Sequence, residues 1–433
     1  MVRPLKIIVQ ALLWIALAGF GATVFAQEAD SPWSTGLHGQ ATVLSRYYPG
    51  QNPAGLYRWQ GEARAELEGE LAYGKYWKGR AVLVANANLE EGRRNRLWAN
   101  EAYVYYRRGH YFFKAGKQTV KWGALTGFSA MDLANRYDYY DVLDTEAERL
   151  GLWGLEARYS KGRTELLLRA FHPDNRSRLY LENNRWVNLP QRMPVPGGEA
   201  AMAYEGAASH YRKDLPLLSG SLSTEVGRVQ LRGSWLYGNN DIPLSRIQVQ
   251  GPMASPVPYE VQLHFEPMMI SALNLSTWAG EWNLWAEGAY VDSKRIGESG
   301  AITPDRYTFC SLGADRFWAF EHPERQLRLV AQLLQVFPHQ AGRYAPTEID
   351  HIFQSAVLVD TELQINYNWS AALRAVGELR AGGFYLEPRL VCKAWAPLRA
   401  ELSGSWLGGS GQSFFGYFQP NSRIALHLIR PIL

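Results

Sequence analysis

Hydrophobic and polar residues alternate along the stretch from Trp59 to Tyr73, WQGEARAELEGELAY. Trp59 and every second residue after it are apolar or small, and the residues between them are polar as far as Glu70. Although Glu, Ala, Leu and Arg favour helices, a helix would scatter this apolar set around its circumference and leave no face to bury. A strand places the whole set on one face. The pattern therefore predicts a long strand with one apolar and one polar face.

The same alternation recurs through the rest of the chain. It is found at 229–237, 259–266, 281–290, 362–369, 373–380 and 398–406. Short breaks predict tight turns at 74–76 and 161–163, and long polar loops are predicted at 172–217, 239–258 and 337–354. Short turns on one rim and long loops on the other are typical of outer-membrane barrels. We therefore predict an all-β fold, a transmembrane antiparallel β-barrel of about 16 strands within a range of about 14 to 18.

A secreted β-sandwich or solenoid is the alternative fold, because its strands also alternate. The buried face of a sandwich is bulky, however, whereas the apolar faces of this chain contain many Ala and Gly residues. Aromatic residues also stand at the ends of the predicted strands, for example Trp59, Tyr73, Trp77 and Trp406. Such residues form girdles at headgroup depth around membrane barrels. This placement favours the barrel.

The N-terminal residues predict the compartment. Arg3 and Lys6 precede an apolar run at 7–20, and small residues follow where a signal peptidase would cleave. We expect 1–26 to be a signal peptide and 27–433 to form a single barrel domain, with an uncleaved membrane anchor as the alternative. Removal of the two basic residues lowers the formal net charge from +4 to +2. This near-balance argues against nucleic acid as a partner.

Charged residues on the predicted inward faces are candidates for lining a lumen. The acidic row within 60–70 lies beside a hairpin partner at 77–89 that carries basic and amide side chains. Opposite charges on neighbouring strands either neutralise each other as cross-strand pairs or set a field across a water-filled pore, and the sequence leaves both interpretations open. The lumen-lining candidates are Glu62, Arg64, Glu66, Lys78, Arg80, Arg374, Glu378 and Arg380.

The segment 115–158 is the most distinctive in the chain, since its middle part is rich in Asp and Tyr and lacks alternation. A long connection without strand pattern is usually functional or disordered, and the aromatic content argues against disorder. We expect this loop to fold into the mouth of the barrel. The constriction-loop candidates are Trp122, Asp132, Asn135, Arg136, Asp138 and Asp141.

Two other interpretations of this loop are open. Trp122 would pin the loop to the barrel wall while the aspartates cap turns. Alternatively, carboxylates would hold calcium, because hard cations take several carboxylate ligands, although the spacing matches no EF-hand loop. The residues of such a site would be Asp138, Asp141, Asp144 and Glu146.

Part of this segment resembles an element of porin-like outer-membrane families, some of them related to polysaccharide export. The residues are Gly116-Lys117-Gln118, Trp122-Gly123, and then Asn135 and Asp138. The family element reads roughly G-[KR]-Q-x-x-x-W-G followed by N-P-x-D, and this chain has Arg136 in place of the proline. The resemblance implies a barrel with a passage and no particular substrate.

We therefore predict a porin-like channel in the lipid bilayer of the outer membrane for passive passage of small polar solutes, with a homo-oligomer left open. The aromatic and mixed-charge lining favours sugars over anions. The alternatives are a polysaccharide export pore, a barrel-type lipid hydrolase and a structural barrel. No enzyme is expected, because GxSxG and HExxH motifs are absent and neither His264 nor His427 has an evident partner. With two cysteines and no CxxC motif, we expect no metal and no cofactor.

Overall fold

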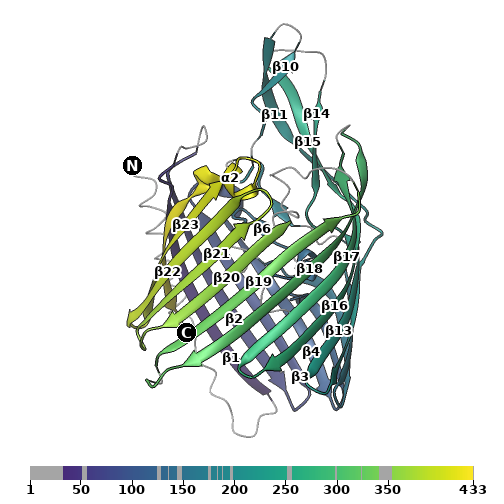
Figure 1. Ribbon diagram of the computed structural model, residues 1–433, viewed down its shortest axis with the longest axis vertical. Helices are drawn as coiled ribbons and strands as arrows, with labels where there is room; N and C mark the ends of the chain where they lie inside the picture. Colours follow the sequence, from purple (N-terminus) through teal and green to yellow (C-terminus); the bar gives the residue numbers. More distant parts are fainter. Residues whose placement is uncertain are drawn as a thin grey trace.

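Eighteen strands form one closed barrel in the computed structural model, which describes residues 33–50, 56–123, 128–134, 136–143, 149–173, 177–182, 184–187, 189–195, 198–250, 256–297, 300–322, 324–340 and 354–432. The wall strands pair antiparallel in chain order, and the last strand pairs with the first to close the barrel (Figure 1). In order around the wall they are β1 (Trp33–Tyr47), β2 (Trp59–Tyr73), β3 (Trp77–Asn88), β4 (Arg96–Arg108), β5 (Tyr111–Gln118), β7 (Leu152–Lys161), β8 (Thr164–Phe171), β12 (Leu217–Val226), β13 (Val229–Asn239), β16 (Pro267–Ala279), β17 (Trp282–Ile296), β18 (Ile302–Ala319), β19 (Gln326–Pro338), β20 (Ser355–Gln364), β21 (Trp369–Glu378), β22 (Gly383–Trp395), β23 (Leu398–Gly409) and β24 (Arg423–Pro431).

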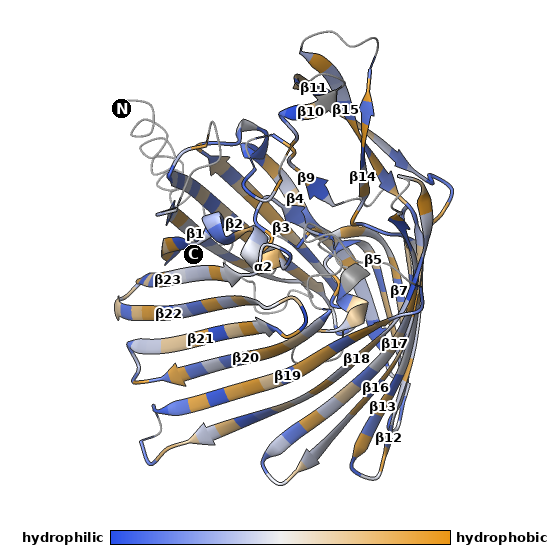
Figure 2. Ribbon diagram, turned by 45° about the horizontal axis from the view of Figure 1, so that its top comes forward, coloured by the Kyte–Doolittle hydropathy of each residue, from blue (hydrophilic) through white to orange (hydrophobic). Residues whose placement is uncertain are grey.

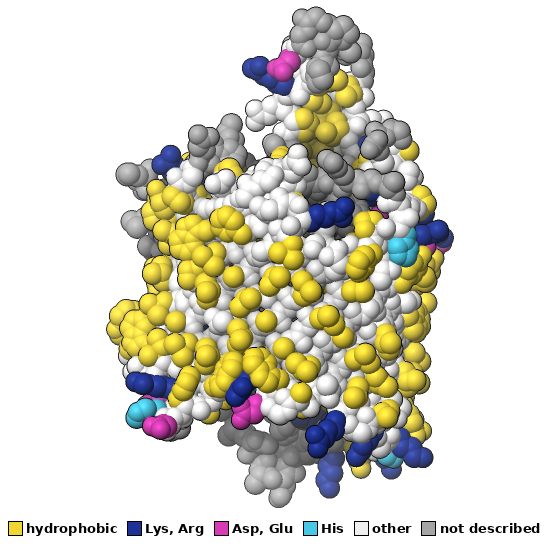
Figure 3. All heavy atoms as spheres, viewed as in Figure 1, with side chains coloured by type: hydrophobic (Ala, Val, Ile, Leu, Met, Phe, Trp, Pro, Cys, Tyr) yellow, Lys and Arg dark blue, Asp and Glu magenta, His cyan; other side chains and the backbone are white. Residues whose placement is uncertain are grey.

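The predicted all-β barrel is thus confirmed, and eighteen strands lie at the upper end of the predicted range. The stretch from Trp59 to Tyr73 is a single strand that pairs along its whole length with β1. Leu67 and Leu71 on it are exposed on the outer surface, whereas Glu62 is buried inside. Figure 2 shows the same alternation of hydrophobic and hydrophilic residues on the neighbouring strands, and Figure 3 shows hydrophobic side chains spread over the outside of the wall.

No helix in the described part of the chain is long and apolar enough to cross a membrane.

The two rims of the barrel differ, as predicted. At the rim where β1 begins, consecutive strands are joined by turns of two to six residues, such as 74–76 and 162–163. At the opposite rim, the connection between β5 and β7 spans 119–151 and is called the inner loop below; the connection between β8 and β12 spans 172–216. Aromatic pairs mark the short-turn rim. Their ring centroids lie 4.4 Å apart in Trp33–Tyr73 and 4.8 Å apart in Trp77–Tyr106.

A four-stranded sheet projects from the long-loop rim (Figure 1). It consists of β10 (Arg192–Val195), β11 (Gly198–Tyr211), β15 (Val257–Phe265) and β14 (Leu244–Val249), with β11 and β15 parallel. The prediction of a wall strand at 259–266 and of polar loops at 172–217 and 239–258 was wrong in this respect. Alternate residues of β15 are buried in a small protein core that includes Tyr259, Val261 and Leu263, rather than facing outward from the barrel. Alternation is the same whether an apolar face meets lipid or a second layer of protein.

A histidine pair in the projecting sheet predicts a pH dependence. His264 stacks on His210 with ring centroids 4.8 Å apart. Burial, His210 and Arg246 lower the pKa of His264, while Glu266 opposes them. Folding therefore disfavours protonation, so the sheet is most stable above the ordinary histidine pKa of about 6.5 and loses stability as the pH falls through it. We expect faster hydrogen exchange in β11 and β15 at about pH 5.5 than at about pH 7.5, after correction for intrinsic rates.

The matched variant for this prediction is His264→Gln, which keeps a polar side chain but does not titrate. The variant should lose the pH dependence of exchange. Equal protection of the native sheet at both pH values, or an unchanged pH dependence in the variant, would contradict the prediction.

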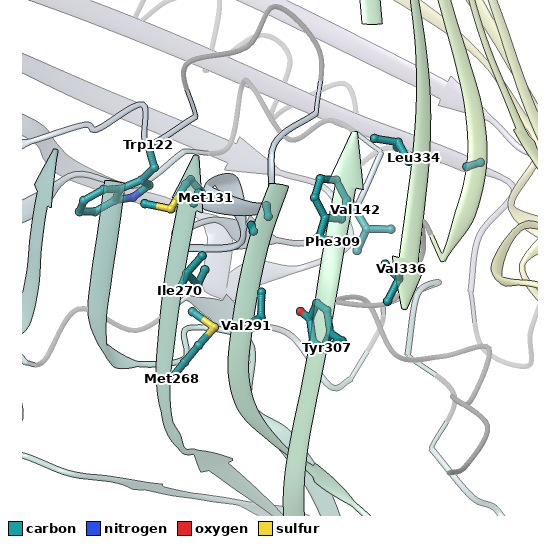
Figure 4. Packing of buried hydrophobic residues seen from close by; sticks show 14 of the residues in the cluster. Trp122, Met131, Val142, Met268, Ile270, Val291, Tyr307, Phe309, Leu334 and Val336 are labelled. Carbon is teal, nitrogen blue, oxygen red and sulfur yellow. The ribbon is translucent and has the colours of Figure 1, made fainter. Parts of the chain in front are cut away.

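The upper lumen holds short elements of the connecting loops (Figure 2). These are η2 (Ala130–Ala134), β6 (Asp138–Tyr139), β9 (Arg178–Leu179), α2 (Phe414–Tyr417) and η4 (Gln419–Asn421). Trp122, Met131 and Val142 of the inner loop join one buried apolar cluster with wall residues such as Ile270 and Phe309 (Figure 4). The inner face of the wall is therefore apolar where loops cover it, and the loops are held by packing as well as by polar contacts.

Candidate functional site: the inner loop and the lumen cavity

The tip of the inner loop is bound to the far wall of the barrel. The backbone N–H of Phe128 donates to Gln332 Oε1 at 2.8 Å, and Gln332 Nε2 donates back to the Phe128 carbonyl at 2.6 Å. Ser129 Oγ and the Ala130 N–H donate to the two carboxylate oxygens of Glu287 at 2.6 and 2.7 Å. These acceptors lie on β17 and β19, six and eight places around the wall from β5. The loop therefore crosses the lumen.

A buried cluster of arginines binds the other end of the loop to the near wall. Asp138 contacts Arg96 and lies 3.8 Å from Arg94 of η1 (Gly92–Arg94). The Tyr180 hydroxyl also donates a hydrogen bond to Asp138 at 3.0 Å. Arg94 is 1% exposed and binds Glu62 at 2.7 Å. Because removing one partner of a buried ion pair leaves an uncompensated charge, the contacts of Asp138 fix the loop strongly, and Glu62 holds Arg94 in place.

Asp141 forms the second half of this cluster. It contacts Arg423 of β24 and lies 3.4 Å from Arg46 of β1. Arg46 lies in turn 3.6 Å from Glu62. Burial alone would raise the pKa of Asp141, but the charges of Arg423 and Arg46 outweigh it and hold the pKa below its ordinary value. Asp141 therefore joins the loop to both strands that close the barrel.

The remaining constriction candidates have different positions. Trp122 is buried and packs edge-on against Phe171 at 5.7 Å, so it lies against the wall. Asp132 accepts a hydrogen bond from the Gly123 N–H at 3.0 Å and lines the cavity described below. Arg136 is buried, and its carbonyl accepts from Leu150 N at 2.8 Å. Asn135 lies outside the described residues.

Steric crowding explains why glycine occupies Gly116 and Gly123 of the G-K-Q and W-G elements. A Cβ added to Gly123 would lie 2.6 Å from Asp132 Oδ2, so the close turn that binds this carboxylate admits no side chain. Gly116 has a φ of 128°, and a Cβ there would lie 2.3 Å from the Ala102 carbonyl oxygen. Both positions therefore require glycine, one inside β5 and the other five residues after its end.

Most lumen candidates on β2 and β3 form ion pairs with charged residues of the same or a neighbouring strand. Arg80 lies 2.9 Å from Glu68 and 3.4 Å from Glu101 of β4, and Arg64 lies 3.4 Å from Glu66. Glu62 belongs to the buried arginine cluster. The contacts of Arg80 are thus those of cross-strand neutralisation, whereas Arg64 and Glu66 pair within β2.

Of the four other lumen candidates, Lys78 lies on β3 and three lie on or just after β21. Arg374 binds Asp360 at 3.0 Å and faces the cavity, and Glu378 is buried at the end of β21. Lys78 is exposed beside the short-turn rim. Arg380 lies two residues beyond the end of β21 and is exposed in the turn 379–382. The assignment of Arg380 to a lumen-facing strand position was therefore wrong.

A cavity of about 630 Å³ lies between the inner loop and the wall from β18 to β23. Tyr307, Phe309 and Phe415 contribute an aromatic side. Among the lining residues, seven are cationic and four are acidic, a surplus of three positive charges. They are Lys121, Arg149, Arg328, Arg374, Arg389, Lys393 and Arg399, and Asp132, Asp360, Glu362 and Glu387. Within the described part of the chain, Lys121, Arg328 and Lys393 have no ion-pair partner.

The site also contains residues that the sequence did not single out. Glu287, Gln332, Arg46, Arg94 and Arg423 hold the inner loop. Glu287 and Gln332 read as ordinary polar positions of alternating strands, so their role has no local signal. Arg46 and Arg423 lie at the long-loop ends of β1 and β24, and neither stretch was singled out as a strand from the sequence.

The two described aspartates of the suggested calcium site, Asp138 and Asp141, bind arginines. Asp138 and Asp141 face guanidinium groups rather than one another. Asp144 and Glu146 lie outside the described residues. In the part of the chain that the structure describes, no group of three His, Cys, Asp or Glu side chains could hold a metal ion.

Comparisons with known proteins agree on the fold. No protein-family model matches the sequence, and no curated protein matches it. Among solved structures, OccK2 (OpdF) of Pseudomonas aeruginosa is similar over 92% of this chain and 97% of its own, with a TM-score of 0.50 and 11% identity. The fold is a porin-like barrel.

Two further structures are similar at lower scores. A BenF-like porin from Pseudomonas fluorescens matches 92% of this chain and 97% of its own, with a TM-score of 0.48 and 9% identity. Wzi of Escherichia coli, described as a carbohydrate-binding β-barrel involved in group 1 capsule assembly, matches 90% of this chain and 84% of its own, with a TM-score of 0.46 and 9% identity.

Proposed function

We propose that the protein is an outer-membrane channel that passes small polar solutes and prefers anions. The observation that carries this proposal is the inner loop, which is bound to both sides of an eighteen-stranded barrel beside a cavity with surplus positive charge. Barrels of about 16 to 18 strands are wide enough for an aqueous channel. A loop fixed across such a lumen narrows the passage and brings solutes close to the charged wall.

The lining explains the preference for anions. Arg328 and Lys393 face the cavity without an ion-pair partner in the described residues, so their charge is available to a solute. Fixed cations in a narrow lumen attract anions and repel cations. Arg374 and Arg389, which bind Asp360 and Glu387, supply hydrogen-bond donors but less free charge. The sequence favoured sugars, and the local charge surplus changes this expectation.

Ion selectivity in a planar bilayer tests the proposal. Across a KCl gradient, the native channel should show current steps. The sign of its reversal potential should show that chloride permeates more readily than potassium. The double variant R328Q/K393Q lowers the surplus from three charges to one, so we expect its chloride-to-potassium permeability ratio to fall toward one. Arg192→Gln in the projecting sheet is the matched control, because Arg192 is exposed and outside the cavity.

Either of two outcomes would contradict the assignment of the cavity. A native channel that prefers cations would overturn the role of the surplus charge. An unchanged permeability ratio in R328Q/K393Q would show that ions do not pass this part of the lumen.

A second candidate function is a barrel that binds a solute at its closed mouth without passing it. It is favoured by the apolar packing of loops over the lumen, where Trp186 stacks on Phe414 at 6.0 Å and contacts Phe418 at 5.2 Å. A silent bilayer with folded, heat-modifiable protein would favour this candidate over the channel. Neither candidate assigns catalysis to the chain, and neither uses a metal or cofactor.

A further inference from the structure

Three alanines on neighbouring strands leave a hollow in the outer surface of the wall. They lie in two cross-strand rows. One row runs through Tyr106, Phe113, Ala157 and Leu168, and the other through Val104, Ala115, Leu155 and Ala170. In both rows, alanine stands beside large apolar side chains. The result is a groove of about 590 Å³ on β3, β4, β5, β7 and β8, called the outer groove below.

The outer groove faces away from the lumen. Phe113, Leu155 and Leu168 are about half exposed, as are outward residues elsewhere on the wall. The residues that alternate with them include Glu156 and Arg169, which bind each other at 2.7 Å. Apolar side chains dominate the lining. The lining residues are Trp77, Val104, Tyr106, Phe113, Ala115, Leu155, Ala157, Leu168 and Ala170, with Lys114, Glu156 and Arg169 between them.

The short turns beneath the groove and next to it are strongly basic. Four turns join β2 to β3, β4 to β5, β7 to β8, and β12 to β13. Counted with two flanking residues on each side, they contain seven Lys or Arg residues and two acids. The seven are Lys75, Lys78, Arg107, Arg108, Lys161, Arg163 and Arg228, and the acids are Glu165 and Glu225.

The other half of the same rim has no such excess. Its four turns, counted in the same way, contain Arg325 and Arg399 against Glu281, Glu321 and Glu324. The surplus of positive charge is therefore confined to the half of the rim that carries the outer groove. Lys75, Arg107, Lys161 and Arg163 are exposed, and none has an ion-pair partner among the described residues.

We propose that the outer groove and the basic turns beneath it bind a phospholipid with an anionic headgroup. The hollow accepts an acyl chain within the apolar belt of the barrel, and exposed cations near a membrane surface attract anionic lipid. The short turns of outer-membrane barrels face the periplasm, where the bilayer leaflet supplies such lipids. Trp77 and Tyr106, with ring centroids 4.8 Å apart, lie between the outer groove and the basic turns. Aromatic rings of membrane proteins are common at this headgroup depth.

A second copy of the chain fits this surface less well. Across a two-fold interface the same patch meets itself, so the basic turns of both copies would face each other. Such repulsion does not arise with a lipid phosphate. The apolar hollow and the exposed cations lie on the same strands and the turns that join them. This placement favours an anionic lipid as the occupant.

Native mass spectrometry of the refolded mature protein in detergent tests the proposal. The probes are dioleoyl phosphatidylglycerol and, for comparison, zwitterionic dioleoyl phosphatidylcholine. We expect saturable binding of phosphatidylglycerol, with an affinity at least about tenfold higher than for phosphatidylcholine. The variant K75Q/R107Q/R108Q/K161Q should lose this preference. Ala157→Leu, which fills the hollow, should weaken binding of phosphatidylglycerol by about the same factor.

Matched controls change the same residue types outside the site. Ala286→Leu lies on the outer face of β17, and Arg325→Gln lies in a turn of the other half of the rim; both should bind as the native protein does. Ala115→Leu and Ala170→Leu fill the hollow from neighbouring strands, so the test does not depend on the folding of one variant. Heat modifiability in gels reports folding in each case.

Three outcomes would overturn the proposal. Equal affinity for the two lipids would remove the role of the headgroup. Loss of binding on charge neutralisation without any effect of the filled groove would reduce the site to a non-specific basic surface. Masses of two or more chains that disappear in Ala157→Leu would show that a second copy, rather than lipid, occupies the groove.

Discussion

Replacing Asp141 by alanine is expected to lower the free energy of unfolding by about 3–5 kcal/mol and to release one end of the inner loop. Asp141 is the carboxylate that Arg423 contacts, and it also lies 3.4 Å from Arg46. Both arginines are less than a tenth exposed. Without the carboxylate, two positive charges on adjoining strands remain in a buried environment, and this is costly. Urea unfolding in detergent and protease cleavage of the loop would measure the two effects.

Companion variants separate loss of the ion pair from general disruption. In the double variant D141A/R423M, one of the charges left behind is also removed, so part of the lost stability should return. Asp214→Ala is the matched control, because Asp214 pairs with Arg212 on the exposed surface and its loss should leave stability unchanged. A D141A protein with native stability and a native loop would show that the arginine cluster does not hold the inner loop.

The barrel could be predicted from sequence because each wall strand reports its own environment. In β2 and β17, a two-residue period is visible without any knowledge of the partner strand. The same rule misplaced β15, since burial against a second layer of protein yields the same period as exposure to lipid. Pattern alone identifies an apolar face and does not identify what covers it.

The sequence predicted that the inner loop is a folded segment, but it did not predict which contacts hold the loop in place. Its length and aromatic content are local properties, whereas Asp141 and Arg423 are 282 residues apart. They meet only because β24 closes the barrel against β1. Glu287 likewise accepts a hydrogen bond from Ser129 at the loop tip, which is 158 positions earlier in the chain. Such pairings depend on the circumference of the barrel, which the pattern of a single strand does not contain.

Charge was predictable only as a total. The full chain has a formal net charge of only +4, and the mixed charges expected in the lining favoured sugars over anions. In the folded protein, however, the lumen cavity has a surplus of three cations, and half of the short-turn rim has a surplus of five. Acidic residues balance these surpluses elsewhere in the chain. Function depends on where charge accumulates, and closure of the barrel determines that.

Replacing Glu287 by alanine is expected to free the tip of the inner loop and to increase the current through the lumen. The variant leaves the Ser129 hydroxyl and the Ala130 N–H without their acceptor. Two buried donors left without an acceptor cost about 2 kcal/mol or more, so the ratio of docked to undocked loop should fall by about thirtyfold or more. Single-channel recording should then show larger and noisier steps than the native protein gives.

Glu281→Ala is the matched control, because Glu281 lies at the short-turn end of the same hairpin and binds Arg316 at the rim. The conductance of Glu281→Ala should equal that of the native protein. If the native protein is silent and Glu287→Ala conducts, the inner loop closes the lumen, and the solute-binding barrel becomes the better description. If neither the size nor the noise of the current changes in Glu287→Ala, the tip of the loop is not the constriction, because its contacts with the far wall then have no effect on the passage.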